Sequence, residues 1–512
     1  MKRYCILVLL VLANLAACTA GSTKSAVVPT VVVTDQAADS AALKQQLTEI
    51  QRLIGERDWP RALAALRSIV DVKSFGSLPS DTQYRILALA SRVAIYHGPA
   101  KLGHEYLARV IAMPQAGYAD WWERLRETDQ AGNDVDSVST LKVVMQRWPD
   151  RAGNLDKDYV LKVVKEAKQL RNGAALALLQ ALYDAHWKLT WDLEPSGAWR
   201  DLTLLVLDRG PLAEAVDVAS HVTSAYVLIA MRADRRFDAV VAASPTQFDI
   251  SAAAERELQA FQAAADKSPR SLELKSWVIN SLLRQQHYEA ALAASDSVLL
   301  DIDSTNYPDK LYEDYAAQRS RFLNLRAVAL ERMGRWDEAL AQLIAASHLN
   351  EKYNGNVSQL IDLGDLYCEL ERPRDALAAI GSIVAPTSPF GAMQLESVRL
   401  EAAQQLRDTQ QVRRSLDYLR AHRADAPSDY VDSFIVVNVL DQAARVLIAQ
   451  LLDKDQRQNA LLNVQGFAPT PGTPRDVELE ARRRKVIARP EVQAAIHEVG
   501  RAESYKLEAP WQ

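Results

Sequence analysis

The chain has 512 residues, which is too many for one compact core, so two to four domains or one repeat array are expected. Gly is scarce, with 19 residues, while Ala and Leu are abundant, and this composition favours helix over sheet. The formal net charge of -5 argues against nucleic acid as a partner, because phosphate binding needs a basic face.

The first 17 residues have the pattern of a signal peptide. Two basic residues at positions 2 and 3 precede an apolar run at positions 6–13. That run is too short to span a bilayer as a stable helix. Residues 1–17 are therefore expected to be removed from the mature protein.

The stretch Leu-Ala-Ala-Cys at residues 15–18 resembles the lipobox of bacterial lipoproteins. The resemblance implies that the Cys18 thiol receives a diacylglyceryl group, that cleavage occurs before it, and that the new amine is acylated. Several acyl chains hold a protein on a membrane almost permanently. Thr19 in place of Asp implies sorting to the outer membrane, facing the periplasm. An ordinary signal peptide with an incidental Cys is the alternative.

Cysteine usage agrees with this hypothesis. Cys5 leaves with the signal peptide and Cys18 is lipidated, so Cys368 is the only remaining thiol. Neither an intramolecular disulfide nor a Cys-rich metal site is then possible. Cys368 lies in an apolar helical pattern and is expected to be a small packing residue.

A tether and then a helical hairpin follow the lipidated residue. Residues 18–38 are small, polar or β-branched and lack helical periodicity, which is typical of a flexible tether. Helical periodicity begins at Asp39 or Ser40, either of which suits an N-cap, and a break at 55–58 separates two helices. Their apolar positions are Leu43, Leu47, Ile50 and Leu53, then Trp59, Ala62, Leu66 and Ile69.

The hairpin pattern recurs along the chain. In its clearest copy, residues 360–383, a Leu and a Gly are adjacent, a Tyr follows three residues after the Gly, and an Ala follows nine residues after the Tyr. Residues 199–222 and 323–346 have nearly the same offsets. Weaker copies begin near Leu43, Phe237, Tyr288 and Val412.

This pattern resembles the tetratricopeptide repeat (TPR). The resemblance implies an all-α superhelix, or solenoid, of antiparallel helical hairpins. Residues 191–463 match the pattern best, and residues 39–190 are helical but degenerate. A plain helical bundle is the alternative for any single hairpin, because an apolar stripe at helical spacing is usually core.

Small residues let the two helices of a TPR hairpin approach closely. The Gly or Ala of the first helix faces the Ala of the second, so both must be small. Gly210 and Gly334 suit the end of a first helix, where a left-handed residue caps it. Thr203 and Val206 depart from the family. The residues expected to pack the repeats are Trp199, Leu202, Gly210, Ala215, Ala327, Gly334, Trp336, Ala339, Leu363, Gly364, Tyr367 and Ala376.

Residues 464–512 form a tail of different composition: a Pro/Gly linker, a charged helix, a last helix from Pro490 and an extended end. The basic run 482–485 could bind a membrane or polymer, but i,i+4 pairing with Glu478 and Glu480 favours a solvated helix face. The extended end could pack on the superhelix or carry a partner motif, and both remain open.

No catalytic motif is present. The sequence lacks HExxH, a Gly-rich phosphate loop with a Lys, GxSxG and CxxC, so no enzyme activity, metal or cofactor is expected. Lytic transglycosylases carry a catalytic Glu in a Glu-Ser pair that precedes a Gly-Leu-Met-Gln-like stretch. Here Glu396-Ser397 follows residues 391–394, so the order is reversed.

The region 121–199 is rich in Trp. Its Trp side chains could form a platform for glycan, or they could wedge hairpins together, which is the more ordinary role. Trp191 and Trp199 flank a predicted loop, so one of them could be exposed. The five side chains are Trp121, Trp122, Trp187, Trp191 and Trp199.

TPR arrays bind extended peptides or helices in a concave groove lined mainly by first helices. The resemblance therefore implies a set of groove positions, although a solvated surface is the alternative for each. No all-basic carboxylate clamp is evident among them. The polar members are Arg200, Asp208, Arg321, Asn324, Glu331, Arg332, Ser358, Asp365 and Glu369.

Three functional hypotheses follow. The first is a non-enzymatic, lipid-anchored TPR scaffold that binds a protein or peptide partner at the cell envelope, for outer-membrane assembly, secretion or pilus formation, or peptidoglycan-synthase regulation. The second is a peptidoglycan- or glycan-binding superhelical protein that uses the Trp-rich region 121–199. The third is a structural protein whose groove is filled by its own tail.

Overall fold

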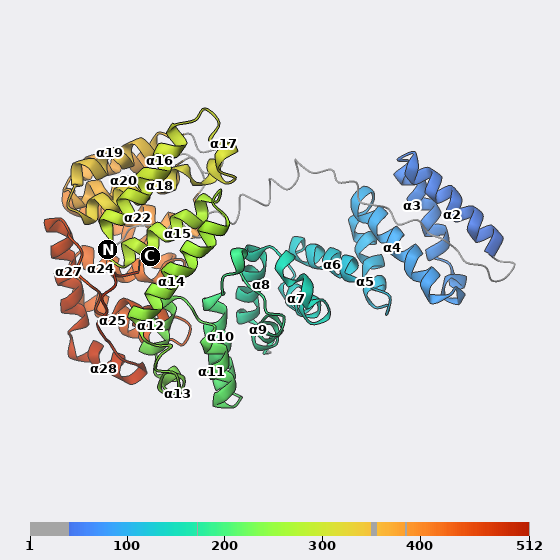
Figure 1. The fold of residues 1–512 in the computed structure, drawn as a ribbon, viewed down its shortest axis with the longest axis horizontal. Helices are drawn as coiled ribbons and strands as arrows, with labels where there is room; N and C mark the ends of the chain where they lie inside the picture. The colour runs from blue at the N-terminus through green and yellow to red at the C-terminus, as the bar shows by residue number, and fades with distance from the viewer. Residues whose placement is uncertain (1–39, 171–172, 350–355, 384–386, 511–512) are drawn as a thin grey trace. The chain divides into compact units, whose positions relative to one another are not determined.

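The chain is helical throughout the part that the computed structural model describes, apart from loops and two isolated bridges (Figure 1). None of the described helices is both long enough and apolar enough to cross a membrane. The expected signal peptide, lipidated Cys18 and tether lie outside the described residues. The described ranges are 40–170, 173–349, 356–383 and 387–510.

The helices fall into two compact units, which divide between Thr190 and Trp191. In the first unit, consecutive helices pack against one another across short loops, as in a row of antiparallel hairpins. Its helices are α2 (Ser40–Gly55), α3 (Trp59–Val70), α4 (Ser80–His97), α5 (Ala100–Ile111), α6 (Tyr118–Gln130), α7 (Asp134–Arg147), α8 (Lys157–Gln169) and α9 (Ala174–Asp184).

The first hairpin has the predicted boundaries. Its second helix, α3, begins directly after Asp58, whose side chain accepts a hydrogen bond from the Arg61 amide at 3.3 Å and so caps the helix. Ile50 and Leu66 are completely buried in the core that α2–α5 share. The apolar spacing in the sequence therefore identifies the buried faces of both helices.

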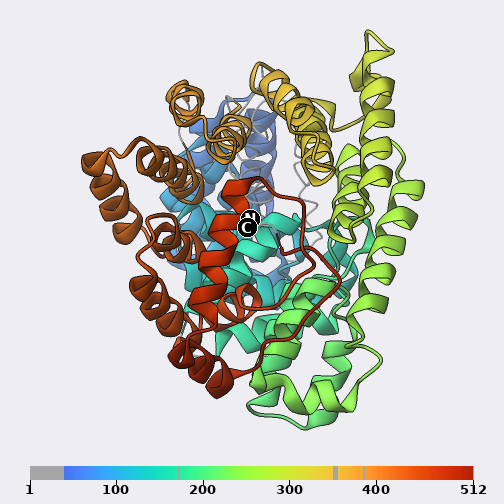
Figure 2. The ribbon, with the colours of Figure 1, turned by 90° about the vertical axis from the view of Figure 1, so that its left-hand side faces the viewer.

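The second unit continues the hairpins from Trp191 onward and curves around the C-terminal segment, which Figure 2 draws in red. Its helices are α10 (Ser196–Leu207), α11 (Leu212–Ser220), α12 (Ala225–Ala233), α13 (Asp238–Ala243), α14 (Ile250–Lys267), α15 (Leu272–Arg284), α16 (Tyr288–Asp303), α17 (Pro308–Leu311), α18 (Tyr315–Arg332), α19 (Trp336–Ser347), α20 (Val357–Glu369), α21 (Pro373–Gly381), α22 (Pro389–Leu406), α23 (Thr409–Ala421), α24 (Pro427–Val436), α25 (Leu440–Leu452), α26 (Arg457–Asn463), α27 (Pro474–Ile487) and α28 (Pro490–Val499).

The adjacent Leu and Gly of the clearest repeat have a steric explanation. Gly364 on α20 faces the next helix, α21, and a Cβ there would lie 2.8 Å from Ile380 Cγ2 and 3.0 Å from Val398 Cγ1. Ala376, the small residue of α21, is completely buried beside it. Close approach of the two helices therefore requires Gly at this position. Both units are all-α arrays of antiparallel hairpins, and the second unit is a TPR-like α–α superhelix.

The two predicted glycine caps differ. Gly334 has a φ of +73°, the left-handed conformation that ends a first helix. Gly210 is not left-handed, contrary to expectation. Pro211 follows it and disfavours helical conformations at the preceding residue. A Cβ on Gly210 would lie only 3.3 Å from the Val206 carbonyl oxygen, so Gly serves here for close packing.

The C-terminal helices belong to the core of the second unit. Val486 of α27 and Ile496 of α28 are buried among the side chains of α24 and α25. At the other end of the unit, α12 packs against α26. Early and late helices of this unit therefore meet, and the tail lies inside the curve that they close (Figure 2).

Candidate peptide groove

Three of the nine predicted groove residues line one cavity of about 830 Å³ in the second unit. Arg332 at the end of α18 lines it together with Asp365 and Glu369 of α20. Trp336, which was assigned to repeat packing, also lines this cavity. Much of the remaining lining comes from tail residues between 464 and 493 and from residues 508–510. The concave face that the TPR resemblance predicts is therefore present, and the tail covers it.

Three other predicted groove residues are buried between helices. Asn324 is completely buried, and its Nδ2 donates to Asp362 Oδ2 at 2.7 Å, which ties α18 to α20. Glu331 is completely buried as well, and Arg321 is 5% exposed. The positions taken from TPR proteins place these three side chains on the solvent-exposed face of a first helix. In this structure, α15 and α20, the first helices of the neighbouring hairpins, pack against that face of α18.

The remaining three lie away from the cavity. Arg200 forms hydrogen bonds of 3.1 and 2.9 Å with the neighbouring Asp201. Asp208 is exposed at the C-terminal end of α10, and Ser358 is half-buried in the first turn of α20. None of these three lines the large cavity in the described structure.

The tail enters the concave face at Gly500. This residue forms an antiparallel bridge with Asp234 at the end of α12, and the amide of Arg501 donates to the Ala233 carbonyl at 2.9 Å. A Cβ on Gly500 would lie 1.9 Å from that carbonyl oxygen, so only Gly fits. The Arg501 side chain also forms an ion pair with Asp238.

Glu508 is the anchor of the extended end. Its carboxylate is 1% exposed and forms an ion pair with Arg332, whose Nε lies 3.1 and 3.2 Å from the two carboxylate oxygens. Its amide donates to the Arg284 carbonyl at 2.9 Å, and its own carbonyl accepts from the Tyr226 hydroxyl at 2.7 Å. Burial raises the pKa of Tyr288, and the nearby Glu508 carboxylate raises it further.

A loop of the tail itself covers the extended end from the other side. The amides of Gly466 and Ala468 donate to the carbonyls of Glu503 and Leu507, both at 2.8 Å. The Phe467 ring lies 6.2 Å from Tyr226 and 6.1 Å from Tyr505. The segment 500–508 therefore lies between this loop and helices α12, α15 and α18.

Ion pairs hold α27 against the same concave face. Arg475 pairs with Glu401 of α22 at 3.0 Å, and Arg483 pairs with Asp432 of α24 at 2.6 Å. Arg482 donates to two carbonyls at the end of α24, at 3.0 and 2.9 Å. The i,i+4 pairs expected within α27 do form, but its basic run also packs against neighbouring helices and is not a purely solvated face.

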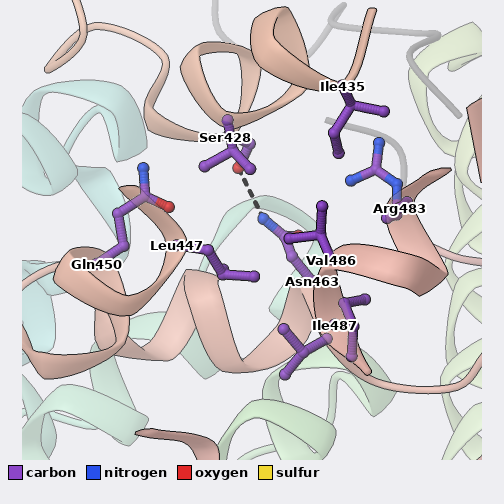
Figure 3. A pocket seen from close by; sticks show the side chains of 10 residues that line it. Ser428, Ile435, Leu447, Gln450, Asn463, Arg483, Val486 and Ile487 are labelled. Atoms are coloured by element: carbon purple, nitrogen blue, oxygen red, sulfur yellow. Dashed lines mark hydrogen bonds between the residues drawn. The ribbon is translucent and has the colours of Figure 1, made fainter. Parts of the chain in front are cut away.

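A second cavity, of about 20 Å³, lies among α24, α25, α26 and α27 (Figure 3). At its wall, Asn463 Nδ2 donates to Ser428 Oγ at 2.7 Å. Leu447, Val486 and Ile487 also line it. This volume holds about one water molecule, so the cavity is a packing gap and not a ligand site.

The candidate catalytic pair is part of the core. The Glu396 carboxylate accepts hydrogen bonds from Ser415 at 2.5 Å and from Arg399 at 2.9 Å, and Glu396 is 7% exposed.

No group of three or more His, Cys, Asp or Glu side chains that could hold a metal occurs in the described ranges. Burial raises the pKa of the Cys368 thiol, as expected for a packing cysteine.

The Trp-rich region is not one surface. Trp187 and Trp199 are each 1% exposed and belong to the core. Trp191 lies edge-on to Trp277, with the ring centroids 5.4 Å apart. Trp121 is half-buried on α6. Trp187 and Trp199 therefore cannot belong to an exposed glycan platform.

A smaller aromatic cluster does reach the surface of the first unit. Trp122, which is 36% exposed, stacks on Tyr118 at 6.4 Å, and Trp148 lies edge-on to Tyr118 at 5.9 Å. The guanidinium groups of Arg147 and Arg151 lie over Trp148 and Tyr118, at 4.8 and 5.8 Å. We call these five residues the α6 aromatic cluster.

No protein-family model matches this chain, and no curated protein does. Among solved structures, the APC/C hetero-tetramer Cut9-Hcn1 is 11% identical, with 88% of each chain covered and a TM-score of 0.29. The Rap protein complexed with competence and sporulation factor is 13% identical over 87% of this chain and 99% of that one, with a TM-score of 0.26. The P58(IPK) TPR domain is 15% identical over 87% and 98%, with a TM-score of 0.20. These scores are too low to support any inference about function.

Proposed function

We propose that this protein is a non-enzymatic scaffold that is lipid-anchored at Cys18, faces the periplasm from the outer membrane, and holds a protein partner in the concave face of its second unit. The lipobox-like residues 15–18, and the small, polar and β-branched residues that follow them, support the anchor. One observation supports the binding role most directly. The concave face already holds an extended polypeptide, residues 500–508, through main-chain and side-chain hydrogen bonds.

In-cell photocrosslinking tests the binding role. Asn324 is completely buried, so the probe belongs at Glu369, which is half-buried and lines the large cavity. Glu338, exposed on α19, is the matched control. We expect one reproducible envelope protein at Glu369 and none at Glu338. The same background of proteins from both positions would refute a partner in the groove.

A separate experiment tests the anchor. Substitution Cys18→Ala removes the thiol that would carry the lipid. We expect the wild-type chain to incorporate labelled palmitate and to fractionate with the outer membrane, and the variant to do neither. Membrane fractionation that does not change in the variant would refute anchoring through Cys18.

A second candidate function is glycan binding by the α6 aromatic cluster. In this cluster an exposed Trp stacks on a Tyr, and two arginine guanidinium groups lie over the neighbouring rings. Such a surface suits a sugar ring, which packs its apolar face on an aromatic side chain. Co-sedimentation with purified sacculi tests this role. We expect Trp122→Ala to reduce binding and Tyr307→Ala, an exposed aromatic residue of the other unit, to leave it unchanged. If the wild-type chain does not co-sediment, this function is excluded.

A further inference from the structure

We infer that residues 500–510 are an internal ligand of the concave face, and that the external partner is an extended peptide with a carboxylate side chain that replaces Glu508. This inference rests on the proposed scaffold function for the existence of a partner. It adds the chemical class of that partner and the segment of the chain with which it competes.

The main-chain bonds of the segment are those that any extended peptide could make. The amides of Arg501 and Glu508 donate to carbonyls at the ends of α12 and α15, both at 2.9 Å. The Tyr226 hydroxyl donates to the Glu508 carbonyl at 2.7 Å. Addition of an extended peptide through main-chain bonds is a common mode of recognition, and side-chain pockets then supply specificity.

The specificity pocket of this face is built for a carboxylate. Arg332 binds the Glu508 carboxylate. The Arg284 guanidinium lies 4.8 Å from the centre of the Tyr226 ring, and the Tyr226 hydroxyl binds the Glu508 carbonyl. Arg284 and Arg332 come from α15 and α18. A second carboxylate, Glu503, pairs with Arg232 of α12 at 2.5 Å. A partner with acidic residues about five positions apart would reproduce both pairs.

The segment is held less firmly than the helices that precede it. Ala502, Ser504 and Lys506 are exposed, and within 501–510 only Leu507 and Glu508 are buried. By contrast, α27 and α28 contribute buried side chains to a shared core. The segment can therefore leave while those helices stay, provided that its hydrogen bonds to the loop at Gly466 also open.

Competition explains how the same face can be both filled and functional. A covalently attached ligand has an effective concentration on the order of millimolar, so it masks the site from weak external peptides. The large cavity beside Glu508 gives an incoming peptide room to bind before the tail has left completely. The partner must then bind better than the tail at the Arg332 pocket.

A peptide-binding measurement on the full chain tests this inference. The probe is a fluorescent peptide with the sequence of residues 500–512, and the readout is its anisotropy. The three chains are wild type, Glu508→Gln and the matched control Lys506→Gln, whose side chain is exposed. We expect Glu508→Gln, whose own tail is loosened, to bind the peptide at least tenfold more tightly than the other two chains.

The same peptide with Gln in place of its Glu at position 508 checks the carboxylate pocket, and we expect its binding to be lost. Absence of binding to a Glu508→Gln chain with a normal far-ultraviolet circular dichroism spectrum would overturn the inference, as would equal binding of both peptides. If Glu508→Gln fails to fold, Glu503→Gln takes its place, because its pair with Arg232 is more exposed. A crosslinked envelope protein at Glu369 together with a negative peptide result would leave the scaffold intact and remove the internal ligand.

Discussion

Two arginines on α18 illustrate how differently burial affects a charged residue. Arg332 has a carboxylate partner, Glu508, that is buried with it. Arg321 is 5% exposed, and burial lowers its pKa to about 10, although the Glu273 and Asp314 carboxylates offset part of that shift. One arginine therefore completes a buried pair, and the other is a buried cation that the fold tolerates at a cost.

We predict opposite effects of Met at these two positions. Arg332→Met leaves the Glu508 carboxylate without its guanidinium and should destabilise the second unit by at most about 3–5 kcal/mol, because release of residues 500–510 returns that carboxylate to water. Arg321→Met removes a desolvated charge and should stabilise it by about 1–3 kcal/mol. Denaturant midpoints measure both effects. A loss of stability in Arg321→Met equal to that in Arg332→Met would contradict this account.

The pH dependence of Arg321 has a definite sign. Its pKa in the folded chain lies below its ordinary value, so the folded state binds fewer protons above pH 10 and stability rises with pH only there. Between pH 6 and 9 the cost of its burial is constant. The stability gain of Arg321→Met, measured from denaturant midpoints, should therefore be the same at pH 6 and at pH 9.

Gly364 gives a second prediction at this scale. Gly364→Ala places a methyl group against Ile380 and Val398 in a packed interface, which should cost about 1–3 kcal/mol. Gly381→Ala is the matched control, because a Cβ there meets no atom within 4 Å. It should be neutral or slightly stabilising, since Ala is the better helix former. Thermal melts of both variants check this, and equal melting temperatures would contradict it.

At the scale of elements, the local sequence accounts for the hairpins but not for the position of the tail helices. α2 and α3 have apolar stripes, a cap and a break that are visible in the sequence. α27 has charged residues on most of its surface, yet Arg475, Arg482 and Arg483 each bind a group on a neighbouring helix. Its position depends on partners elsewhere in the chain.

Removal of residues 476–512 should strongly destabilise the second unit. The deletion uncovers the faces of α24 and α25 that Val486, Val492 and Ile496 bury. Each buried aliphatic side chain contributes about 1.5–3 kcal/mol, so we expect the melting temperature to fall by about 10 °C or more. Removal of residues 511–512 alone is the control and should have little effect. An unchanged melt of the larger deletion would show that these helices do not stabilise the unit.

At the scale of the whole second unit, closure depends on the meeting of its two ends. α12 packs on α26, and Gly500 lies against the carbonyl of Ala233. Arg332 and Glu508 are 176 residues apart in the chain, and Tyr226 and Glu508 are 282 apart. Contacts of this range connect the first hairpins of the unit to the end of the chain.

Gly500→Ala should open this closure without removing any helix. The added Cβ would overlap the Ala233 carbonyl oxygen, so the segment after it must shift. We expect the amides of Arg501 and Glu508 to lose hydrogen-exchange protection while the amides within α12 keep theirs. Gly197→Ala, where a Cβ meets no atom within 4 Å, serves as the control. Unchanged protection at Arg501 and Glu508 would contradict the role of Gly500.

The composition and periodicity of the sequence were enough to predict an all-α chain of helical hairpins, because helical spacing and small-residue positions are local properties. The superhelix was implied by the resemblance of these hairpins to the TPR. Composition and periodicity also identify positions such as Gly364 and Ala376, which pack against each other within one repeat. The groove was predicted only in part. Arg332, Asp365 and Glu369 line the cavity, whereas Asn324 and Arg321 are buried because neighbouring first helices cover them.

The sequence by itself therefore determined the class of fold, the hairpin boundaries and the absence of known catalytic motifs. Only the tertiary structure decided what lies in the concave face. The carboxylate pocket is assembled from α12, α15, α18 and the tail, and no spacing rule connects residues that far apart. Whether the extended end would pack or remain free depended on one matched pair, Arg332 and Glu508, and on one residue without a side chain, Gly500.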